Sequence, residues 1–538
     1  MPRIKINGKS CHFEGRKTIL QVANENGVEI PQYCYHDGLS VVASCRICLA
    51  EVAQPDPRNN NKPTLIPKLM PTCQTPAVDG SEVFTQTDKA RDNQKQVMED
   101  LLINHPLDCP VCDQAGECYL QDYSYRYGRG YSRFEEDKIK QPKKDIGPHV
   151  LLYSDRCIMC TRCVRFTREI TGTSELGVVG RGNREEIDVF PGKPLDNPLS
   201  GCVVDLCPVG ALLDKEFLFE QRVWFLTSTP SIDGITASGD NLFIDHNEGR
   251  VWRVKPRYNA QVNQWWTSDE IRHGWNFVHC DNRLRMPLVK VNGAAMEANW
   301  KDAVAATVAK LKGKKIAFMA SPMLSCEDAY LLAKTMRGFD AQAALGVGPV
   351  PFIGEDQTFR GGYTIHAEKA PNARGVHRAL SLAANGGQVH DAASLIQQFK
   401  NADVLVITGN YPNCWVPDDL LDAVSGGGKT LILIDTLPVK LAPKADIVLP
   451  GATWVEKSGC FENAKNLIQH FDQAIAPLEY SRPEAQIAID IAAAAGQCAW
   501  SNYNVPTTRQ QMGEPFATGI QAFNKADYRE PEIQFVEI

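Results

Sequence analysis

The sequence lacks the marks of exported, membrane-spanning and nucleic-acid-binding proteins. Its beginning, MPRIKINGKSCHFEG, has no charged leader followed by a long apolar core, and no later run approaches the roughly 18 apolar residues of a membrane helix. The net charge is -7 at pH 7, so no basic surface for nucleic acid or anionic lipid is expected. We therefore expect a globular chain that does not enter a bilayer and whose partners are other proteins.

Motifs for nucleotides and for hydrolytic catalysis are also missing. No G-x-G-x-x-G opens a helix after a strand, which leaves no dinucleotide site to assign. The stretch SGGGKT, 425–430, is similar to the end of a P-loop, but Ala423 stands where that motif has its first glycine, and the stretch precedes a strand. No Ser-His-Asp spacing or pair of carboxylates points to chemistry. We expect no complete active site on this chain.

Cysteine is absent from residues 208 to 279 and sparse beyond them, although the chain of 538 residues has 18 cysteines. Most of them are packed into CxxC-type groups within the first 210 residues. A disulfide scaffold in an exported protein is one interpretation of so many cysteines. The clustered spacing instead favours metal binding in a reducing compartment.

The first group of cysteines has the form C-x10-C-x2-C-x24-C. A loop that carries three thiolates and closes on a fourth from a nearby strand is typical of a 2Fe-2S site, although the first gap is longer than in the plant-type spacing. The stretch YCYHDGLSVVASCRICLAEV supplies Gly and Ser for a wrapped loop whose backbone N–H groups point at sulfur. A four-cysteine zinc site needs two CxxC-like knuckles, and only one is present. The expected 2Fe-2S ligands are Cys34, Cys45, Cys48 and Cys73.

The second group, in HPLDCPVCDQAGECYLQDYSYRYG, has the form H-x3-C-x2-C-x5-C, and Gly116 allows a turn within it. On ligand count alone, a Cys3His zinc site is an alternative. A 4Fe-4S cluster with one imidazole ligand fits the neighbouring groups better. Replacing a thiolate by a neutral imidazole is expected to raise the reduction potential. The expected ligands are His105, Cys109, Cys112 and Cys118.

The third group combines DRCIMCTRCVRF with the later DLCPVGAL. A CxxCxxC run with a remote Cys-Pro is the signature of bacterial ferredoxins. A second cluster would need another CxxCxxC, but the corresponding stretch offers only Cys202, which we expect to be a spare thiol. The expected ligands of one 4Fe-4S cluster are Cys157, Cys160, Cys163 and Cys207.

With these ligand orders and the stretches HPLDCPVCDQAGEC, DRCIMCTRCVRF and CPVGAL, about the first 220 residues resemble the large iron-sulfur subunit of respiratory complex I, NADH:quinone oxidoreductase, which is the G-type subunit in bacteria. The resemblance implies one 2Fe-2S and two 4Fe-4S clusters that carry electrons from the flavin subunit toward quinone. It implies as partners a flavin/NADH-binding subunit and other hydrophilic subunits, including the ferredoxin-like and quinone-site subunits. It also implies a peripheral place on the cytoplasmic side of the bacterial inner membrane.

The second half is similar to the C-terminal region of the same family, which resembles molybdopterin-guanine-dinucleotide oxidoreductases. Some bacterial members hold an extra four-cysteine 4Fe-4S cluster at the start of that region, where this sequence has no cysteine. The region also looks too short for a complete four-subdomain molybdenum enzyme. We expect neither molybdopterin nor the extra cluster, and a scaffold role is our hypothesis for this half.

The expected fold class is multidomain α/β and α+β. Residues 3–14 predict a hairpin, 18–30 and 88–104 predict helices, and 53–71 predict a surface loop. From about residue 224, apolar runs such as DVLVITGNYP alternate with helical patterns, which predicts parallel strands with crossover helices. The expected parts are a 2Fe-2S ferredoxin-like domain (1–87), a His/Cys3 4Fe-4S domain (88–140), a 4Fe-4S ferredoxin-like domain (141–222), a degenerate molybdopterin-oxidoreductase-like α/β domain (223–504) and an extended or disordered C-terminal arm (505–538).

Other classes share parts of this pattern. The iron-sulfur subunit of a molybdenum formate dehydrogenase, or of another NADH-linked oxidoreductase, is the alternative interpretation. An iron-only hydrogenase shares the N-terminal ligand groups but needs a further cysteine-rich catalytic domain. The sparse cysteines after residue 210 exclude it.

Overall fold

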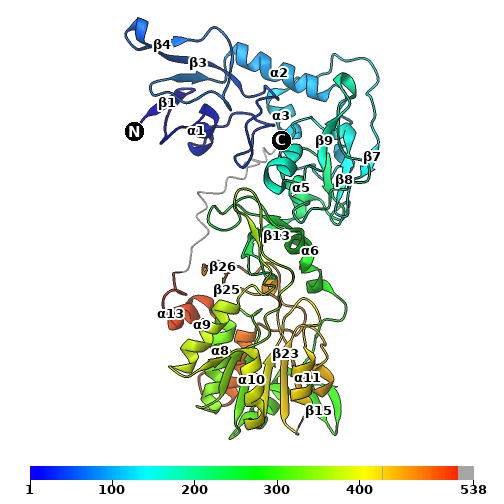
Figure 1. The fold of residues 1–538 in the computed structure, drawn as a ribbon, viewed down its shortest axis with the longest axis vertical. Coiled ribbons are helices and arrows are strands. Elements are labelled where there is room, and N and C mark those ends of the chain that lie inside the picture. The colour runs from blue at the N-terminus through cyan, green and yellow to red at the C-terminus, as the bar shows by residue number, and fades with distance from the viewer. Residues whose placement is uncertain (427, 519–538) are drawn as a thin grey trace. The chain divides into compact units, whose positions relative to one another are not determined.

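The computed structural model of the chain describes residues 1–426 and 428–518. These residues form two compact units (Figure 1). Unit 1 comprises 1–225 with 359–361, and unit 2 comprises 226–358 and the described residues from 362 onward. Among the described residues, no helix has the length and apolar character needed to cross a bilayer.

The first part of unit 1 is a small mixed sheet with one helix packed on it. The strand order is β2-β1-β6-β3-β4, with β5 paired to β3. Helix α1 (Ile19–Glu25) begins with a capping box between Thr18 and Gln21 and buries its apolar face. The strands are β1 (Arg3–Ile6), β2 (Lys9–His12), β3 (Leu49–Asp56), β4 (Lys62–Leu65), β5 (Met70–Pro71) and β6 (Glu82–Phe84). The predicted hairpin is confirmed, and the predicted helix is shorter than 18–30.

The prediction of a surface loop over 53–71 is wrong, because β3 and β4 pair antiparallel there from Ala53↔Leu65 to Asp56↔Lys62. Asn60 and Asn61 adopt positive φ angles of 49° and 57° and turn the chain between the strands. Strand β4 is at the sheet edge, where proline is tolerated because its missing N–H is not needed on the outer side.

The remainder of unit 1 joins helices α2 to α5 to small antiparallel sheets. Helix α2 (Asp88–Leu102) starts at the N-cap Thr87 and confirms the predicted helix to within two residues of its end. One sheet has the order β11-β8-β7, and β9 pairs with β10. The other elements are α3 (Tyr119–Tyr127), β7 (Lys143–Asp145), β8 (Val150–Tyr153), α4 (Arg162–Phe166), β9 (Leu176–Val179), β10 (Glu186–Val189), α5 (Cys202–Leu206) and β11 (Leu212–Asp214).

Unit 2 is built around an eight-stranded sheet of order β16-β15-β24-β23-β22-β17-β18-β21. The six strands from β24 to β21 run parallel, and their order corresponds to the doubly wound 3-2-1-4-5-6 arrangement. Its strands are β15 (Leu288–Val291), β16 (Ala294–Glu297), β17 (Ile316–Ala320), β18 (Ala344–Val347), β21 (Val389–His390), β22 (Val404–Thr408), β23 (Thr430–Asp435) and β24 (Ile447–Pro450). The predicted parallel α/β architecture is confirmed.

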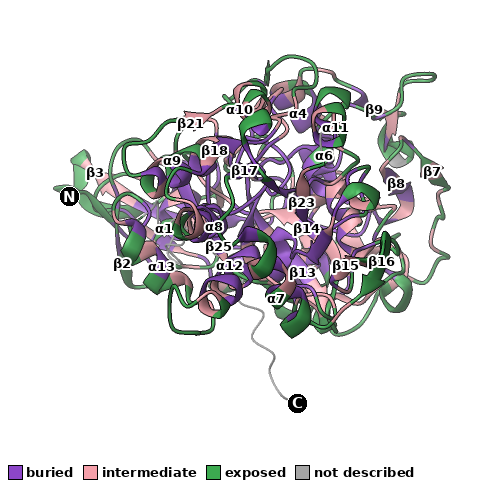
Figure 2. Ribbon diagram, turned by 90° about the horizontal axis from the view of Figure 1, so that it is seen from below, coloured by how far each residue is buried: buried purple, intermediate pink, exposed green. Residues whose placement is uncertain are grey.

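Helices cover both faces of this sheet, so its central strands are buried along their lengths (Figure 2). One apolar core holds residues of α7, α8, α9 and α12, and another holds residues of α10 and α11. These helices are α7 (Trp300–Leu311), α8 (Cys326–Phe339), α9 (Ala373–Ala384), α10 (Ala392–Gln398), α11 (Asp418–Ser425) and α12 (Glu484–Ala494).

A separate antiparallel sheet opens unit 2, in the order β12-β13-β14. Its strands and the helix packed against it are β12 (Thr227–Ile232), β13 (Asn241–Asn247), β14 (Arg250–Pro256) and α6 (Asp269–His273). Two short hairpins complete the unit: β19 (Gln357–Thr358) with β20 (Thr364–Ile365), and β25 (Gly459–Glu462) with β26 (Ile468–Phe471).

An extended or disordered arm was predicted from residue 505, and this prediction is wrong for the first residues of the arm, which form a helix. Helix α13 (Val505–Met512) is capped by Asn504 and has proline in its first turn, where proline fits a helix. Met512 and Phe516 are buried in the larger core of unit 2, which fixes this segment. The rest of the arm, 519–538, lies outside the described residues.

Candidate iron-sulfur sites

The first set of predicted ligands is gathered around the loop that leads into β3. Cys34, Cys48 and Cys73 are buried, and Cys45 is half-buried. A hydrogen bond from the Cys45 thiol lowers the pKa of Cys34, and one from the Cys73 thiol lowers the pKa of Cys48. The structure therefore brings these four side chains together as two contacting thiol pairs.

The backbone of this loop directs N–H groups at sulfur. Ala43 and Arg46 have φ angles of 52° and 59°, so left-handed residues stand on both sides of Cys45. The N–H groups of Ser44 and Cys45 bond to the sulfur of Cys34 and stabilise its thiolate form. Alternating left- and right-handed residues form such anion-binding concavities at many iron-sulfur sites.

The second set follows the end of α2. Burial, and then the charges of Arg156 and Lys138, lower the pKa of His105 to about 4, so the ring is neutral. Its Nδ1 is buried and has no hydrogen-bond partner. A neutral imidazole with an unpartnered ring nitrogen fits a metal-ligand role.

The three cysteines of the second set differ in exposure. Cys112 and Cys118 are buried, whereas Cys109 is exposed. Burial raises the pKa of Cys118 to about 12, and the N–H groups of Gln121 and Leu120 oppose that rise. The turn expected at Gly116 is present, with a φ angle of 95°.

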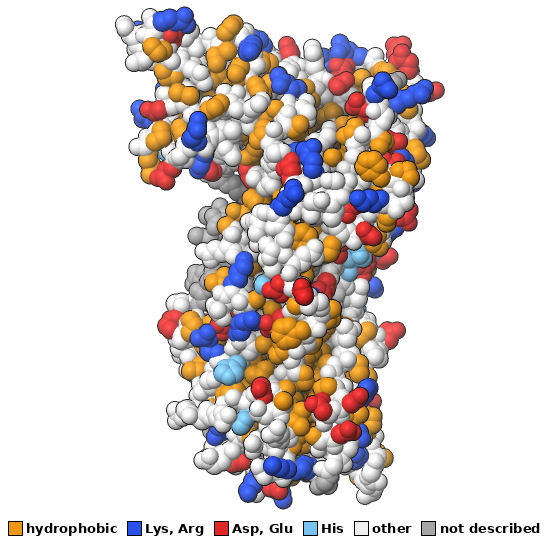
Figure 3. All heavy atoms as spheres, in the orientation of Figure 1, with side chains coloured by type: hydrophobic (Ala, Val, Ile, Leu, Met, Phe, Trp, Pro, Cys, Tyr) orange, Lys and Arg blue, Asp and Glu red, His pale blue; other side chains and the backbone are white. Residues whose placement is uncertain are grey.

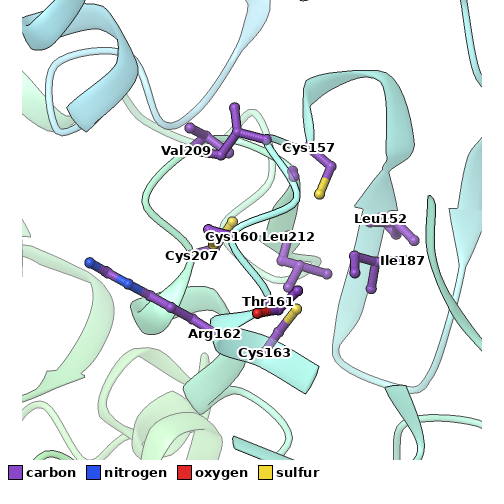
Figure 4. A pocket seen from close by; sticks show the side chains of 12 residues that line it. Leu152, Cys157, Cys160, Thr161, Arg162, Cys163, Ile187, Cys207, Val209 and Leu212 are labelled. Carbon is purple, nitrogen blue, oxygen red and sulfur yellow. The ribbon is translucent and has the colours of Figure 1, made fainter. Parts of the chain in front are cut away.

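The third set lines one pocket together with apolar side chains, as Figure 4 shows. The pocket encloses about 350 Å³, including solvent at its mouth. Its lining is Leu152, Cys157, Ile158, Cys160, Thr161, Arg162, Cys163, Ile187, Cys207, Val209, Ala211 and Leu212. All four predicted cysteines therefore border a common, largely apolar space.

Backbone donors also surround the third set. Met159 and Thr161 have φ angles of 51° and 59°, and they alternate with the cysteines of the CIMCTRC run. The N–H of Met159 donates to the sulfur of Cys157 over 3.4 Å. Burial raises the pKa of Cys207 to about 11, although three backbone N–H groups in the CPVGALL stretch oppose that rise. N–H donors of this kind tune the potential of a sulfur-ligated cluster.

No group of three or more His, Cys, Asp or Glu side chains converges on a point suited to one metal ion in residues 1–426 and 428–518. A cluster spreads its cysteines over several iron atoms, so its ligands need not meet at one point. The buried sulfurs, the N–H groups directed at them and the unpartnered His105 nitrogen fit such clusters.

One apolar cluster in unit 1 contains cysteines from all three sets. Tyr33, Met98, Leu120, Tyr123, Ile158 and Val209 form it with Cys34 and Cys45 of the first set, Cys118 of the second, and Cys157, Cys160 and Cys207 of the third. The rings of Tyr33 and Tyr123 lie 5.2 Å apart within it. Cysteines of all three sets are thus neighbours in one apolar part of unit 1.

Three buried arginines, which the sequence did not predict, lie beside these cysteines. Arg156 donates to the Asp108 carboxylate over 2.8 Å, and its guanidinium lies over the Tyr153 ring. Arg162 and Arg165, on α4, are 6% and 3% exposed. These arginines alternate with the cysteines of the third group in DRCIMCTRCVRF, and this pattern could have indicated their role from the sequence.

Cys202, the expected spare thiol, is buried in α5 and is not among the residues that line the pocket of the third set. The stretch SGGGKT precedes strand β23, as expected, and Gly427 within it lies outside the described residues.

Comparison with protein-family models gives five matches along the chain. They are a 2Fe-2S iron-sulfur cluster binding domain (2–88), the NADH-ubiquinone oxidoreductase-G iron-sulfur binding region (94–133), the ferredoxin-like domain of NADH-quinone oxidoreductase subunit 3 (147–213), the NDSU1/NuoG-like 4Fe-4S domain (226–276) and molybdopterin oxidoreductase (418–494). The fourth match falls where the sequence has no cysteine, and there the structure has the β12-β13-β14 sheet and α6.

Whole-chain comparison finds relatives among NADH-quinone and NADH-ubiquinone oxidoreductase subunits. The G subunit of the NADH-quinone oxidoreductase of Rickettsia felis is 38% identical over 335 residues, which are 62% of this chain and 48% of the relative. The NADH-ubiquinone oxidoreductase 75 kDa subunit of Reclinomonas americana is 42% identical over 303 residues, which are 56% of this chain and 42% of the relative. The alignments thus span about half the length of these curated relatives.

Among solved structures, one chain of an NAD+-reducing [NiFe]-hydrogenase in the H2-reduced state is 25% identical and covers 41% of this chain and 91% of that chain. Its TM-score of 0.35 supports no conclusion about fold.

The domain matches and the arrangement of the cysteines define an iron-sulfur protein whose C-terminal part resembles molybdopterin oxidoreductases. Within that class, the chain is homologous over about 60% of its length to the G subunit of an NADH-quinone oxidoreductase and to the 75 kDa subunit of an NADH-ubiquinone oxidoreductase.

Proposed function

We propose that this chain is the iron-sulfur electron-transfer subunit of an NADH:quinone oxidoreductase and relays electrons from the flavin subunit toward quinone. The observation that carries the proposal is the single apolar cluster to which all three cysteine sets contribute. Electron transfer requires redox centres that are close together and shielded from water. Cysteine sets that share one apolar cluster would hold their redox centres close together and away from water.

The proposal assigns a cluster to each set. The first set holds a 2Fe-2S cluster, and the second and third sets each hold a 4Fe-4S cluster. When bound, these clusters supply one-electron chemistry. The residues of this chain bind them, exclude water and direct backbone N–H groups at their sulfurs. Such donors stabilise the more negative, reduced form.

Unit 2 acts as a scaffold without molybdopterin or a fourth cluster. The absence of cysteine from 208 to 279 supports this part of the proposal. The doubly wound sheet has its switch point between β17 and β22, where such folds bind nucleotides. Side chains of the chain itself occupy that position, because Met323 and Tyr411, which follow these two strands, are packed together in a buried cluster.

The relatives' names state only that they are subunits of NADH-quinone or NADH-ubiquinone oxidoreductases, and we propose for this chain the partners that the family resemblance implies. They are the flavin/NADH-binding subunit and the other hydrophilic subunits of the complex, on the cytoplasmic side of a bacterial inner membrane. Positive and negative side chains are interspersed on the face shown in Figure 3.

Chemical analysis of anaerobically prepared protein tests the cluster assignment. We expect roughly ten iron atoms per chain with matching acid-labile sulfide, from one 2Fe-2S and two 4Fe-4S clusters. Zinc without labile sulfide, or about half that iron, would overturn the proposal. Molybdenum in the same preparation would favour the formate dehydrogenase alternative. Co-purification with a flavoprotein and membrane-embedded subunits tests the assignment to the complex.

A further inference from the structure

Two arginines on α4 are buried between the loops of the first and third sets. Arg165 donates from Nη2 to the carbonyl oxygens of Cys34, over 2.5 Å, and Cys160, over 3.2 Å. Its Nη1 donates to the carbonyl oxygen of Ser40 over 2.5 Å. One guanidinium therefore connects the backbones of both ligand loops.

Arg162 makes the same kind of connection. Its Nη2 donates to the carbonyl oxygen of Tyr35, beside Cys34, over 2.5 Å. Its Nη1 donates to the carbonyl oxygen of Leu206, beside Cys207, over 3.3 Å. Each arginine thus donates to a backbone carbonyl at or beside a cysteine of the first set and to another at or beside a cysteine of the third set.

Neither guanidinium has a carboxylate partner. Within residues 1–426 and 428–518, no Asp or Glu oxygen lies within 4.0 Å of either one, and the Nε atoms of both are buried without a hydrogen-bond partner. Burying a charge is costly unless an opposite charge compensates it. The Glu169 carboxylate acts on Arg165 only from beyond ion-pair distance. Two buried cations beside two sets of thiolates therefore indicate that further negative charge comes from those sets when they are loaded.

We propose that Arg162 and Arg165 are positioning residues that hold the first and third ligand loops together, and whose charges raise the reduction potentials of the clusters at both sites. This inference rests on the proposed function. One-electron reduction adds one negative charge to a cluster, and a nearby fixed cation stabilises that charge. No bond of the protein is made or broken.

The second set provides an internal reference. The cations that act on His105 are Arg156 and Lys138, and neither α4 arginine is among them. A change at α4 should therefore alter the potentials of the first and third sites and leave that of the second unchanged.

The test compares Arg165→Gln with Arg165→Lys in the assembled complex. Midpoint potentials are measured by redox titration with EPR, in which 2Fe-2S and 4Fe-4S centres are observed at different temperatures. We expect Arg165→Gln to lower the midpoint potentials of the first and third sites by at least about 59 mV. For one electron, this shift corresponds to a tenfold change in the reduced-to-oxidised ratio. Arg165→Lys retains the charge and should stay close to wild type. The matched control is Arg168→Gln, because the Arg168 side chain is 63% exposed.

Unchanged potentials in Arg165→Gln, or an equal shift at the second site, would overturn the inference while leaving the proposed function standing. A wild-type protein without iron and labile sulfide would instead remove the proposed function. If Arg165→Gln fails to assemble, the same titration is made on Arg162→Gln, and the same two outcomes decide.

Discussion

Gly210 lies against the sulfur of Cys112: a Cβ built on Gly210 would stand 2.2 Å from Cys112 Sγ. Gly210 belongs to the Cys-Pro segment of the third set, whereas Cys112 belongs to the second. The Cys-Pro segment therefore supports both sites, because it supplies Cys207 to one and close backbone packing to the other.

We expect Gly210→Ala to disrupt the second site selectively. The added methyl group can be accommodated only if Cys112 Sγ moves, since Gln114 Cβ, at 3.2 Å, also limits the space. A displaced Sγ no longer reaches its iron. The variant should lose about four irons per chain, which is one 4Fe-4S cluster, and should keep the EPR signals of the other two sites.

Gly130→Ala is the control for this substitution. Gly130 is exposed, has no heavy atom within 4 Å of a built Cβ, and follows Cys118 of the second set in the sequence. It should retain all iron. Equal iron content in Gly210→Ala and wild type would show that the contact with Cys112 is not required.

His105→Cys should lower the reduction potential of the second cluster. A thiolate in place of the neutral imidazole adds one negative charge to the assembly and so disfavours reduction. Redox titration followed by EPR measures the midpoint, and the signals of the first and third sites serve as references. An unchanged midpoint at the second site would contradict a ligand role for His105.

Cys207 and Cys202 provide a matched pair for the third site. Cys207→Ser removes a predicted ligand that lines the pocket, so it should cost about four irons per chain. Cys202→Ser changes a buried thiol five residues earlier that is not part of that lining, so the iron content should stay that of wild type. Iron analysis of both variants measures these outcomes. A loss of iron in Cys202→Ser would show that the ligand assignment of the third set is wrong.

Cysteine spacing predicts the three sets because most members of each set fall in one short run, and only Cys73 and Cys207 are remote from the rest of their sets. The parallel sheet was equally clear, since fully buried strands such as β22 and β23 are continuous apolar runs. The β3–β4 hairpin was missed because Pro55 and Pro63 indicate a loop by composition, although they lie at the sheet edge. Arg165 was missed because its partner Cys34 lies 131 residues away along the chain.

Lys457→Met should strongly destabilise unit 2. The Lys457 ammonium lies 2.8 Å from Asp328 and 2.5 Å from Glu484, and all three side chains are buried. Without the lysine, two carboxylates remain in an apolar interior, at a cost of about 3–5 kcal/mol. Denaturant unfolding measures this loss. Lys440→Met is the control, since Lys440 is half exposed and its nearest carboxylate is 3.7 Å away. A loss below about 1 kcal/mol in Lys457→Met would contradict the expectation.

The Asp240 side chain is 1% exposed, and its carboxyl group accepts a hydrogen bond from the Tyr363 hydroxyl over 2.7 Å. Burial, and then the charge of Asp233, raise the pKa of Asp240 to about 8. Between the ordinary carboxyl pKa and that value, the folded protein holds a proton that the unfolded chain has lost. Stability from this group is therefore fully present at acidic pH and is lost as pH rises toward 8, by up to about 1.4 kcal/mol per pH unit.

Asp240→Asn removes this titration while keeping an oxygen that accepts from Tyr363. The difference in stability between the variant and wild type should therefore shift in favour of the variant as pH rises from about 4.5 to 8. Thermal unfolding midpoints across that range measure the difference. Asp472→Asn, at an exposed carboxyl, should give a curve parallel to wild type. A curve for Asp240→Asn that is also parallel to wild type would mean that Asp240 is ionised in the folded protein throughout this range, and that its burial is compensated by a cation.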